Sequence, residues 1–211
     1  MFDEKIICLA EDGGSWGKNE TCSVIYNDKC WVNNHAHVIT TNNGTPYVAY
    51  IDDEYSDKLS VMKFDGSNWV NVGSPGFTAN KVRDYVNLEF AGSTPYVAFL
   101  DRDSNNQATV MKYDGTNWVT VGQRGFTKDE ADGIKLAIDG TTPYIAFVDA
   151  DNSDKASVMK FDGTTWVAVG ALGFSEGDAN DLDIAIDKGV PYVAFQDNEN
   201  DDKATVMSFI R

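Results

Sequence analysis

Hydrophobic and polar residues alternate with a period of two along most of the chain. Between residues 134 and 170, strand-like runs appear as IKLAID (134–139), PYIAFVD (143–149), ASVMKFD (156–162) and the shorter WVAVG (166–170). Alternation of this kind over four to eight residues, rich in β-branched and aromatic side chains, is typical of strands. The segments between the runs, DGTTP, DADNSDK and DGTT, are turn sequences. The pattern therefore predicts four short antiparallel strands and no helix.

This unit repeats along the chain. The hexapeptide TPYVAY at 45–50 returns as TPYVAF (94–99), TPYIAF (142–147) and VPYVAF (190–195), with its prolines 49, 48 and 48 residues apart. Four strands in a unit of this length are typical of a β-propeller blade. We therefore predict an all-β fold, a β-propeller of four-stranded antiparallel blades. Tyr144, Phe147, Trp166 and their equivalents should pack between adjacent blades.

The repeats divide the chain into an atypical segment, residues 1–36, and propeller repeats over 37–211. The expected repeats are about 37–85, 86–133, 134–181 and 182–211, and the last lacks the WV-VG strand. An open sheet edge is an aggregation liability, so we expect the N-terminal segment to complete the ring. Within that segment, SVIYNDKCWV (23–32) matches the third and fourth strands of a unit with one residue deleted. We predict about five blades, with four as the alternative.

Two resemblances follow from these motifs. The PYVAF strand, the VMKFDG segment before the tryptophan, and GFT resemble the repeats of many bacterial β-propeller proteins, often secreted or surface-exposed and mostly of unassigned function. That resemblance covers about four-fifths of the chain and implies the fold rather than an activity. AEDGGSWG (10–17) and CWVNNHAHVI (30–39) resemble part of the target-recognition domain of type I restriction enzyme specificity subunits, over about 35 residues. The second resemblance implies a chimera, natural or engineered, or a DNA-recognition fragment.

The charge of the chain argues against the DNA-recognition alternative. Asp and Glu outnumber Lys and Arg 33 to 17, which gives a net charge of −16. Proteins that grip a phosphate backbone normally do so with clustered Lys and Arg, so nucleic acid is an unfavourable partner. If DNA is bound, we expect the contacts to come from the stretch CWVNNHAHVI (30–39), through Trp31, Asn33, Asn34, His35 and His37.

The same sequence bears on the membrane and on the compartment. It contains no apolar run of about eighteen residues, so we expect no membrane span. The N-terminus is acidic where a signal peptide would be basic, which favours a cytoplasmic location unless a leader lies outside this sequence.

Metal chemistry has two candidate locations. Cys8, Cys22, Cys30, His35 and His37 lie within thirty residues, but no CxxC pair is present, and we expect buried or free thiols rather than a zinc site.

The loops between the second and third strands carry alternating carboxylates that resemble calcium loops, because hard cations prefer several oxygen ligands. The best of these positions are Asp149, Asp151 and Asp154, followed by Asp101 and Asp103. The alternative is a solvated hairpin whose side chains accept local backbone hydrogen bonds. No other cofactor is expected.

The acidic loops and the GFT connections should lie on one face of a propeller. This face would be acidic and edged by Phe77, Phe126 and Phe174, which makes it the expected binding surface.

No GxSxG, HExxH, P-loop or GxGxxG motif in a suitable context is present, so we expect no enzyme. The favoured function is a non-enzymatic binding or scaffold module for a protein, glycan or cation. A fold without a selected ligand is a further alternative, and either a monomer or a homo-oligomer assembled through the incomplete last blade is compatible with the sequence.

Overall fold

A computed structural model describes residues 25–26, 29–30 and 37–209 of the chain. The chain divides into two units, Met1–His35 and Ala36–Arg211. In the first unit, β1 (Ile25–Tyr26) and β2 (Lys29–Cys30) pair antiparallel.

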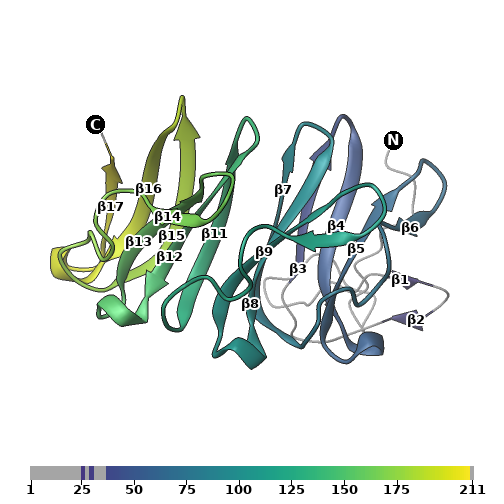
Figure 1. The fold of residues 1–211 in the computed structure, drawn as a ribbon, viewed down its shortest axis with the longest axis horizontal. Coiled ribbons are helices and arrows are strands. Elements are labelled where there is room, and N and C mark those ends of the chain that lie inside the picture. The colour runs from purple at the N-terminus through teal and green to yellow at the C-terminus, as the bar shows by residue number, and fades with distance from the viewer. Residues whose placement is uncertain (1–24, 27–28, 31–36, 210–211) are drawn as a thin grey trace, which may run out of the picture. The chain divides into compact units, whose positions relative to one another are not determined.

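The second unit consists of four antiparallel sheets in chain order (Figure 1). The first sheet contains β3 (His37–Asn42), β4 (Thr45–Asp52), β5 (Lys58–Phe64) and β6 (Trp69–Asn71). The second contains β7 (Val82–Ala91), β8 (Thr94–Asp101), β9 (Gln107–Tyr113) and β10 (Trp118–Thr120). The third contains β11 (Ala131–Asp139), β12 (Thr142–Asp149), β13 (Lys155–Phe161) and β14 (Trp166–Ala168). The fourth has three strands, β15 (Ala179–Asp187), β16 (Val190–Asp197) and β17 (Lys203–Ser208).

These sheets confirm the predicted all-β fold and the four-stranded unit. The predicted acidic loops each contain one short 3₁₀ turn: η1 (Asp53–Tyr55), η2 (Arg102–Ser104), η3 (Ala150–Asn152) and η4 (Asn198–Asn200). Over the described residues, no helix combines the length and the apolar character that a membrane span requires.

The first strand of three sheets carries a bulge. The register shifts between Arg83 and Asn87 in β7, and a shift at the equivalent place, with one residue fewer inside it, recurs in β11 and β15. The residues inside the shifts have positive φ: Tyr85 (66°), Gly133 (52°) and Asp181 (48°). Only glycine adopts this conformation without strain, so the equivalent position is relaxed in β11 and strained in β7.

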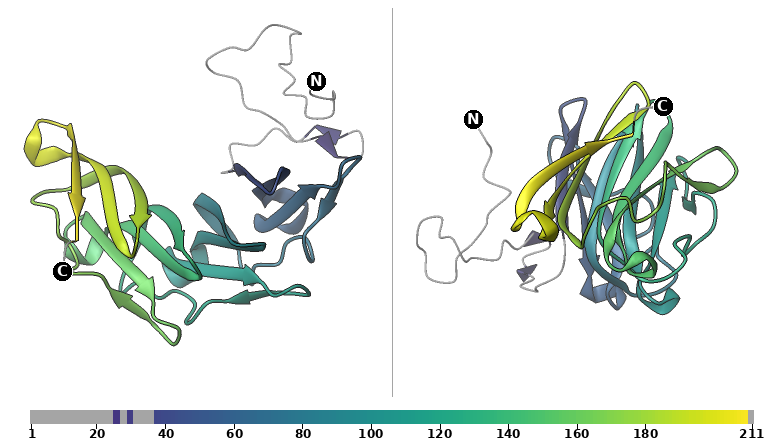
Figure 2. Two further views of the ribbon diagram at one scale, coloured as in Figure 1. Left: turned by 90° about the horizontal axis from the view of Figure 1, so that it is seen from above. Right: turned by 90° about the vertical axis from the view of Figure 1, so that its left-hand side faces the viewer.

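The hydrophobic core lies between consecutive sheets, which follow one another face to face (Figure 2). We call the face of a sheet that packs on the next sheet its forward face, and the opposite one its backward face. In the second sheet Ala98 and Val110 belong to the forward face, whereas Leu88 and Phe99 belong to the backward face. Successive residues of a strand point to opposite faces, so the period-two pattern supplies one apolar set for each neighbour. The second and third sheets therefore carry side chains of the core on both faces.

Tryptophans at the start of β10 and β14 fasten the second and the third sheet to the sheet before each. The Trp118 indole Nε1–H donates to the Val72 carbonyl at 2.7 Å, and Trp166 Nε1–H donates to Val121 at 2.8 Å. Trp166 is 6% exposed, Phe147 is buried in the same interface, and Tyr144 is buried in the next one. The prediction that these three residues belong to the core is confirmed, whereas Tyr192, the equivalent of Tyr144 in the fourth sheet, is 42% exposed.

The forward face of the fourth sheet is less covered than the faces between sheets. Tyr192 and Val206 on this face are 42% and 66% exposed, whereas Tyr144 and Val158 in the third sheet are 3% and 2% exposed. On the backward face of the first sheet Ile39 is 59% exposed, but its neighbours Val48 and Met62 are buried. The described residues thus form four blades. The fifth blade and the closure of the ring by residues 1–36 depend on residues outside the described part, apart from β1 and β2, and stay predictions.

Candidate functional site

The aspartates that recur at the start of the acidic loops have structural partners. Asp149 is 4% exposed, and its Oδ2 accepts from Ser157 Oγ at 2.6 Å and from Asn152 Nδ2 at 2.9 Å. Ser157 Oγ in turn accepts from the Gly173 N–H at 2.8 Å. The first sheet has the same series of hydrogen bonds, in which Ser60 Oγ donates to Asp52 and accepts from the Gly76 N–H. A buried carboxylate is stable only when it is hydrogen-bonded, and these contacts provide that compensation while fastening the GF connection to the sheet.

Two of the remaining proposed calcium ligands form ion pairs with basic side chains. Asp101 is 3% exposed and forms an ion pair with Arg124. Asp151 pairs with Lys128 at 2.7 Å. Asp103 and Asp154 lie exposed in their loops. Within the described ranges, no group of three or more His, Cys, Asp or Glu side chains is placed to hold a metal ion. The calcium site stays a prediction without geometric support.

The predicted binding phenylalanines lie at the sheet interfaces. Phe77 stacks on Trp118 with ring centroids 4.4 Å apart, and Phe126 stacks on Trp166 at 4.1 Å. Phe174 packs edge-on against Phe195 at 6.3 Å. All three are half-buried, and their contact with a ligand stays a prediction.

The residues of the DNA alternative are mostly outside the described part of the chain. This applies to Trp31, Asn33, Asn34 and His35. His37 opens β3 and is exposed. The DNA-recognition role stays a prediction.

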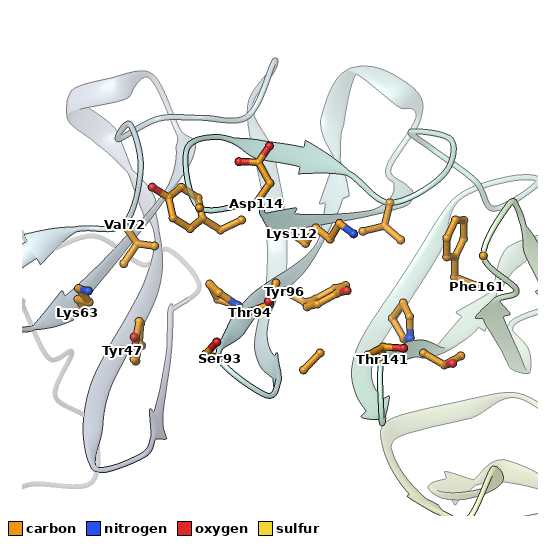
Figure 3. A pocket seen from close by; sticks show the side chains of 18 of the residues that line it. Tyr47, Lys63, Val72, Ser93, Thr94, Tyr96, Lys112, Asp114, Thr141 and Phe161 are labelled. Carbon is orange, nitrogen blue, oxygen red and sulfur yellow. The ribbon is translucent and has the colours of Figure 1, made fainter.

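A different region carries the cavity that we regard as the candidate site. It has a volume of about 980 Å³ and is lined by residues of the first three sheets (Figure 3). The lining includes Ser93 and Thr141 in the turns between the first and second strands, and Asp114 and Asp162 in the turns that follow the third strands. These turns lie at the end of the strands opposite to the acidic loops, because the loops join the second strand to the third.

The cavity contains two equivalent halves because the repeats are equivalent. The first half-site combines Tyr47, Lys63 and Val72 of the first sheet with Thr94, Pro95 and Tyr113 of the second. The second half-site combines Tyr96, Lys112 and Val121 of the second sheet with Thr142, Pro143 and Phe161 of the third. Figure 3 shows Tyr96 and Lys112 between Tyr47 and Lys63 on one side and Thr141 and Phe161 on the other. A ligand group that fits one half-site therefore meets similar side chains in the other, except that Phe161 in the second takes the place of Tyr113 in the first.

Each half-site places a cation beside a phenol. Tyr47 lies directly opposite Lys63 in the β4–β5 pair, and Tyr96 lies opposite Lys112 in the β8–β9 pair. Burial raises the pKa of Tyr96, so its hydroxyl stays protonated and can both donate and accept a hydrogen bond. Backbone N–H groups of Asn117 and Thr116 lower the pKa of Asp114, which keeps this carboxylate ionised at the cavity rim.

Aromatic rings together with a few polar groups are typical of sites that hold small ligands. The cavity offers ring surfaces, hydroxyl groups, ammonium groups and carboxylates within one open volume. Sequence reasoning assigned the aromatic residues to the core and did not identify this site. The signal that could have found it is the recurrence of Tyr and Lys at fixed positions of the second and third strands.

Comparisons with known proteins support the fold. No protein-family model and no curated protein sequence matches the chain significantly. Among solved structures, a triple arginine-to-alanine mutant of AofleA from Arthrobotrys oligospora is similar with a TM-score of 0.58 and 13% identity, over 92% of this chain and 59% of that one. The fungal lectin of Aleuria aurantia, described as a six-bladed β-propeller with a fucose recognition mode, is similar with a TM-score of 0.54 and 18% identity. The match covers 84% of this chain and 60% of the lectin. An α-L-arabinanase of Penicillium chrysogenum complexed with arabinobiose is similar with a TM-score of 0.52 and 10% identity. The match covers 82% of this chain and 61% of the arabinanase.

The chain has a β-propeller fold. It spans about 60% of the length of these neighbours. At such identities the likeness establishes the fold alone, since one fold carries many functions. None of the three structures named above is a restriction enzyme subunit, and that resemblance stays a prediction.

Proposed function

We propose that this propeller is a glycan-binding module and that the cavity of the first three sheets is its sugar site. The observation that carries the proposal is the composition of the two half-sites, each with aromatic rings, a threonine and a lysine around one opening. A sugar presents apolar C–H faces between hydroxyl groups. Tyrosine and phenylalanine rings suit those faces, and the Thr, Tyr and Lys side chains supply donors and acceptors for the hydroxyl groups.

Binding suits this cavity better than hydrolysis. Glycoside hydrolysis commonly uses one carboxyl group as a general acid, and its pKa is then raised. Asp114 and Asp162 line the cavity, and local backbone N–H groups lower the pKa of both. Neither carboxyl group is therefore suited to donate a proton near neutral pH. The fold neighbours include both lectins and glycosidases, and the side chains of the site favour the former role.

The test begins with a screen of the full chain on a glycan array, followed by calorimetric titration of the sugars retained. Lys112→Gln removes an ammonium group from the cavity and should weaken binding about tenfold, the equivalent of losing one charge-assisted hydrogen bond. Lys160→Gln is the matched control, because Lys160 lies opposite Tyr144 in the equivalent pair of the third sheet and is not among the residues lining this cavity. An array without any retained glycan, or equal losses in both variants, would refute the proposal. Release of free sugar from the retained glycans would replace binding by hydrolysis.

A further inference from the structure

The two half-sites of the cavity repeat in geometry as well as in composition. In the first, the Tyr113 ring lies tilted by 47° against Trp118, with ring centroids 5.6 Å apart. In the second, the Phe161 ring lies tilted by 52° against Trp166 at 5.9 Å. The Tyr–Lys pairs of the two half-sites also face each other in the same register of their sheets. A ligand group that contacts these side chains therefore meets both half-sites in the same orientation.

Each half-site also ends at a carboxylate that is held in one orientation. Asp114 Oδ1 accepts from two backbone N–H groups of its own turn, both at 2.8 Å. Asp162 Oδ1 accepts in the same way, again at 2.8 Å. With Lys63 and Lys112, the described lining thus carries two negative and two positive charges. A charged ligand gains nothing overall from such a lining, whereas hydroxyl groups can accept from the ammonium groups and donate to the carboxylates.

Both half-sites belong to one volume of about 980 Å³. Figure 3 shows Tyr47, Tyr96 and Phe161 one after another across the three sheets. Packed sheets follow one another at roughly 10 Å, a spacing that one sugar ring does not span. Pockets of roughly 300–1,000 Å³ enclose drug-sized ligands, so this cavity has room for several linked sugars. The two half-sites are filled together only by a chain of sugars.

We propose that the two half-sites bind two like, uncharged sugar residues of one unbranched oligosaccharide. An unbranched chain repeats one residue in one direction, as the successive sheets do, whereas the ends of a branched glycan diverge. The first bound residue holds the second close to its half-site, so a spanning chain binds about a hundredfold more tightly than a single sugar. This inference rests on the proposed function and adds to it the class of glycan.

The experiment titrates the full chain with cello-, xylo-, manno- and galacto-oligosaccharides, from the monosaccharide to the octasaccharide. Nuclear magnetic resonance follows the backbone amides of Gly115 and Gly163, which line the first and the second half-site. We expect at least one series to bind. Its affinity should rise by about a hundredfold at the length that spans both half-sites and should stay level in longer chains.

A variant of one half-site tests whether a single chain occupies both. Lys63→Gln changes the first half-site and should weaken the response of Gly163, in the second, to a spanning chain at least tenfold. The response of Gly163 to the monosaccharide should stay unchanged, because a single sugar binds each half-site independently. Lys160→Gln is the matched control and should alter neither response, because Lys160 does not line the cavity.

The outcomes separate this inference from the proposed function. Affinity that does not rise with chain length would overturn the inference while leaving glycan binding in place. The same holds if Lys63→Gln leaves the response of Gly163 to the longest chain unchanged, or if the glycan array retains only branched or charged glycans. An array that retains no glycan would refute both.

Discussion

The sharpest test of how the blades are held together is Trp118→Phe. In the native structure the Trp118 side chain is 8% exposed, stacks on Phe77, and donates its indole N–H to the Val72 carbonyl at 2.7 Å. Phenylalanine keeps most of the ring contact but has no N–H. The Val72 carbonyl is then left without that donor in a buried site.

The expected cost follows from these contacts. Leaving a buried acceptor unsatisfied costs about 1–3 kcal/mol. Removing part of a buried aromatic ring adds about 1 kcal/mol by area bookkeeping. The sum is about 3 kcal/mol, and for a domain of this size each kcal/mol shifts the melting temperature by roughly 2–4 °C. We expect a melting temperature lower by about 6–12 °C.

The assay is thermal and urea unfolding followed by far-ultraviolet circular dichroism, which does not depend on tryptophan fluorescence. The matched control is Trp69→Phe, because Trp69 begins the fourth strand of the first sheet but is only half-buried and lies tilted against Phe64 at 5.8 Å. It should cost less than about 1 kcal/mol, as expected for a substitution outside the core. Equal losses in the two variants would refute the view that these tryptophans act by bonding to the preceding sheet.

Three further changes test other parts of the fold. Gly133→Ala should destabilise the protein by about 1–2 kcal/mol in urea unfolding, because φ at this position is +52° while a Cβ would meet only ordinary contacts, and no loss would refute the strain assigned to the bulge. Ser157→Ala should cost about 2–4 kcal/mol, because it removes a hydrogen bond to the buried Asp149 carboxylate and one from a backbone N–H; Ser157→Thr should restore most of that stability, as Thr occupies the equivalent position in the second sheet. The pKa of Asp114 is lowered below its ordinary 3.8 by backbone N–H groups, so its stabilising effect is complete above that pH and is lost as the pH falls. Asp114→Asn should therefore give a shallower decline of stability with acidification below about pH 4, and an unchanged acid profile would contradict the assignment.

Several features of the fold could be predicted from local sequence. The alternation in PYIAFVD and ASVMKFD determined strands, because successive side chains of a strand point to opposite faces. The repeat spacing determined the four-stranded unit and the propeller. The recurrence of Tyr144, Phe147 and Trp166, the last of which is missing from the final repeat, predicted that they belong to the core. The strands and the repeating unit are confirmed because each depends on residues close together in the chain.

The sites depended on contacts between repeats, which spacing alone does not reveal. Asp149 was a calcium candidate by its loop sequence, but its partner Ser157 lies on the next strand, where the pairing of β12 with β13 decides the contact. The cavity joins Tyr96 of one sheet to Phe161 of the next, residues 65 positions apart (161 − 96). The sequence by itself thus determined the unit and its repetition. Only the packing of one sheet on another decided which of the recurring aromatic rings are buried and which line an open cavity.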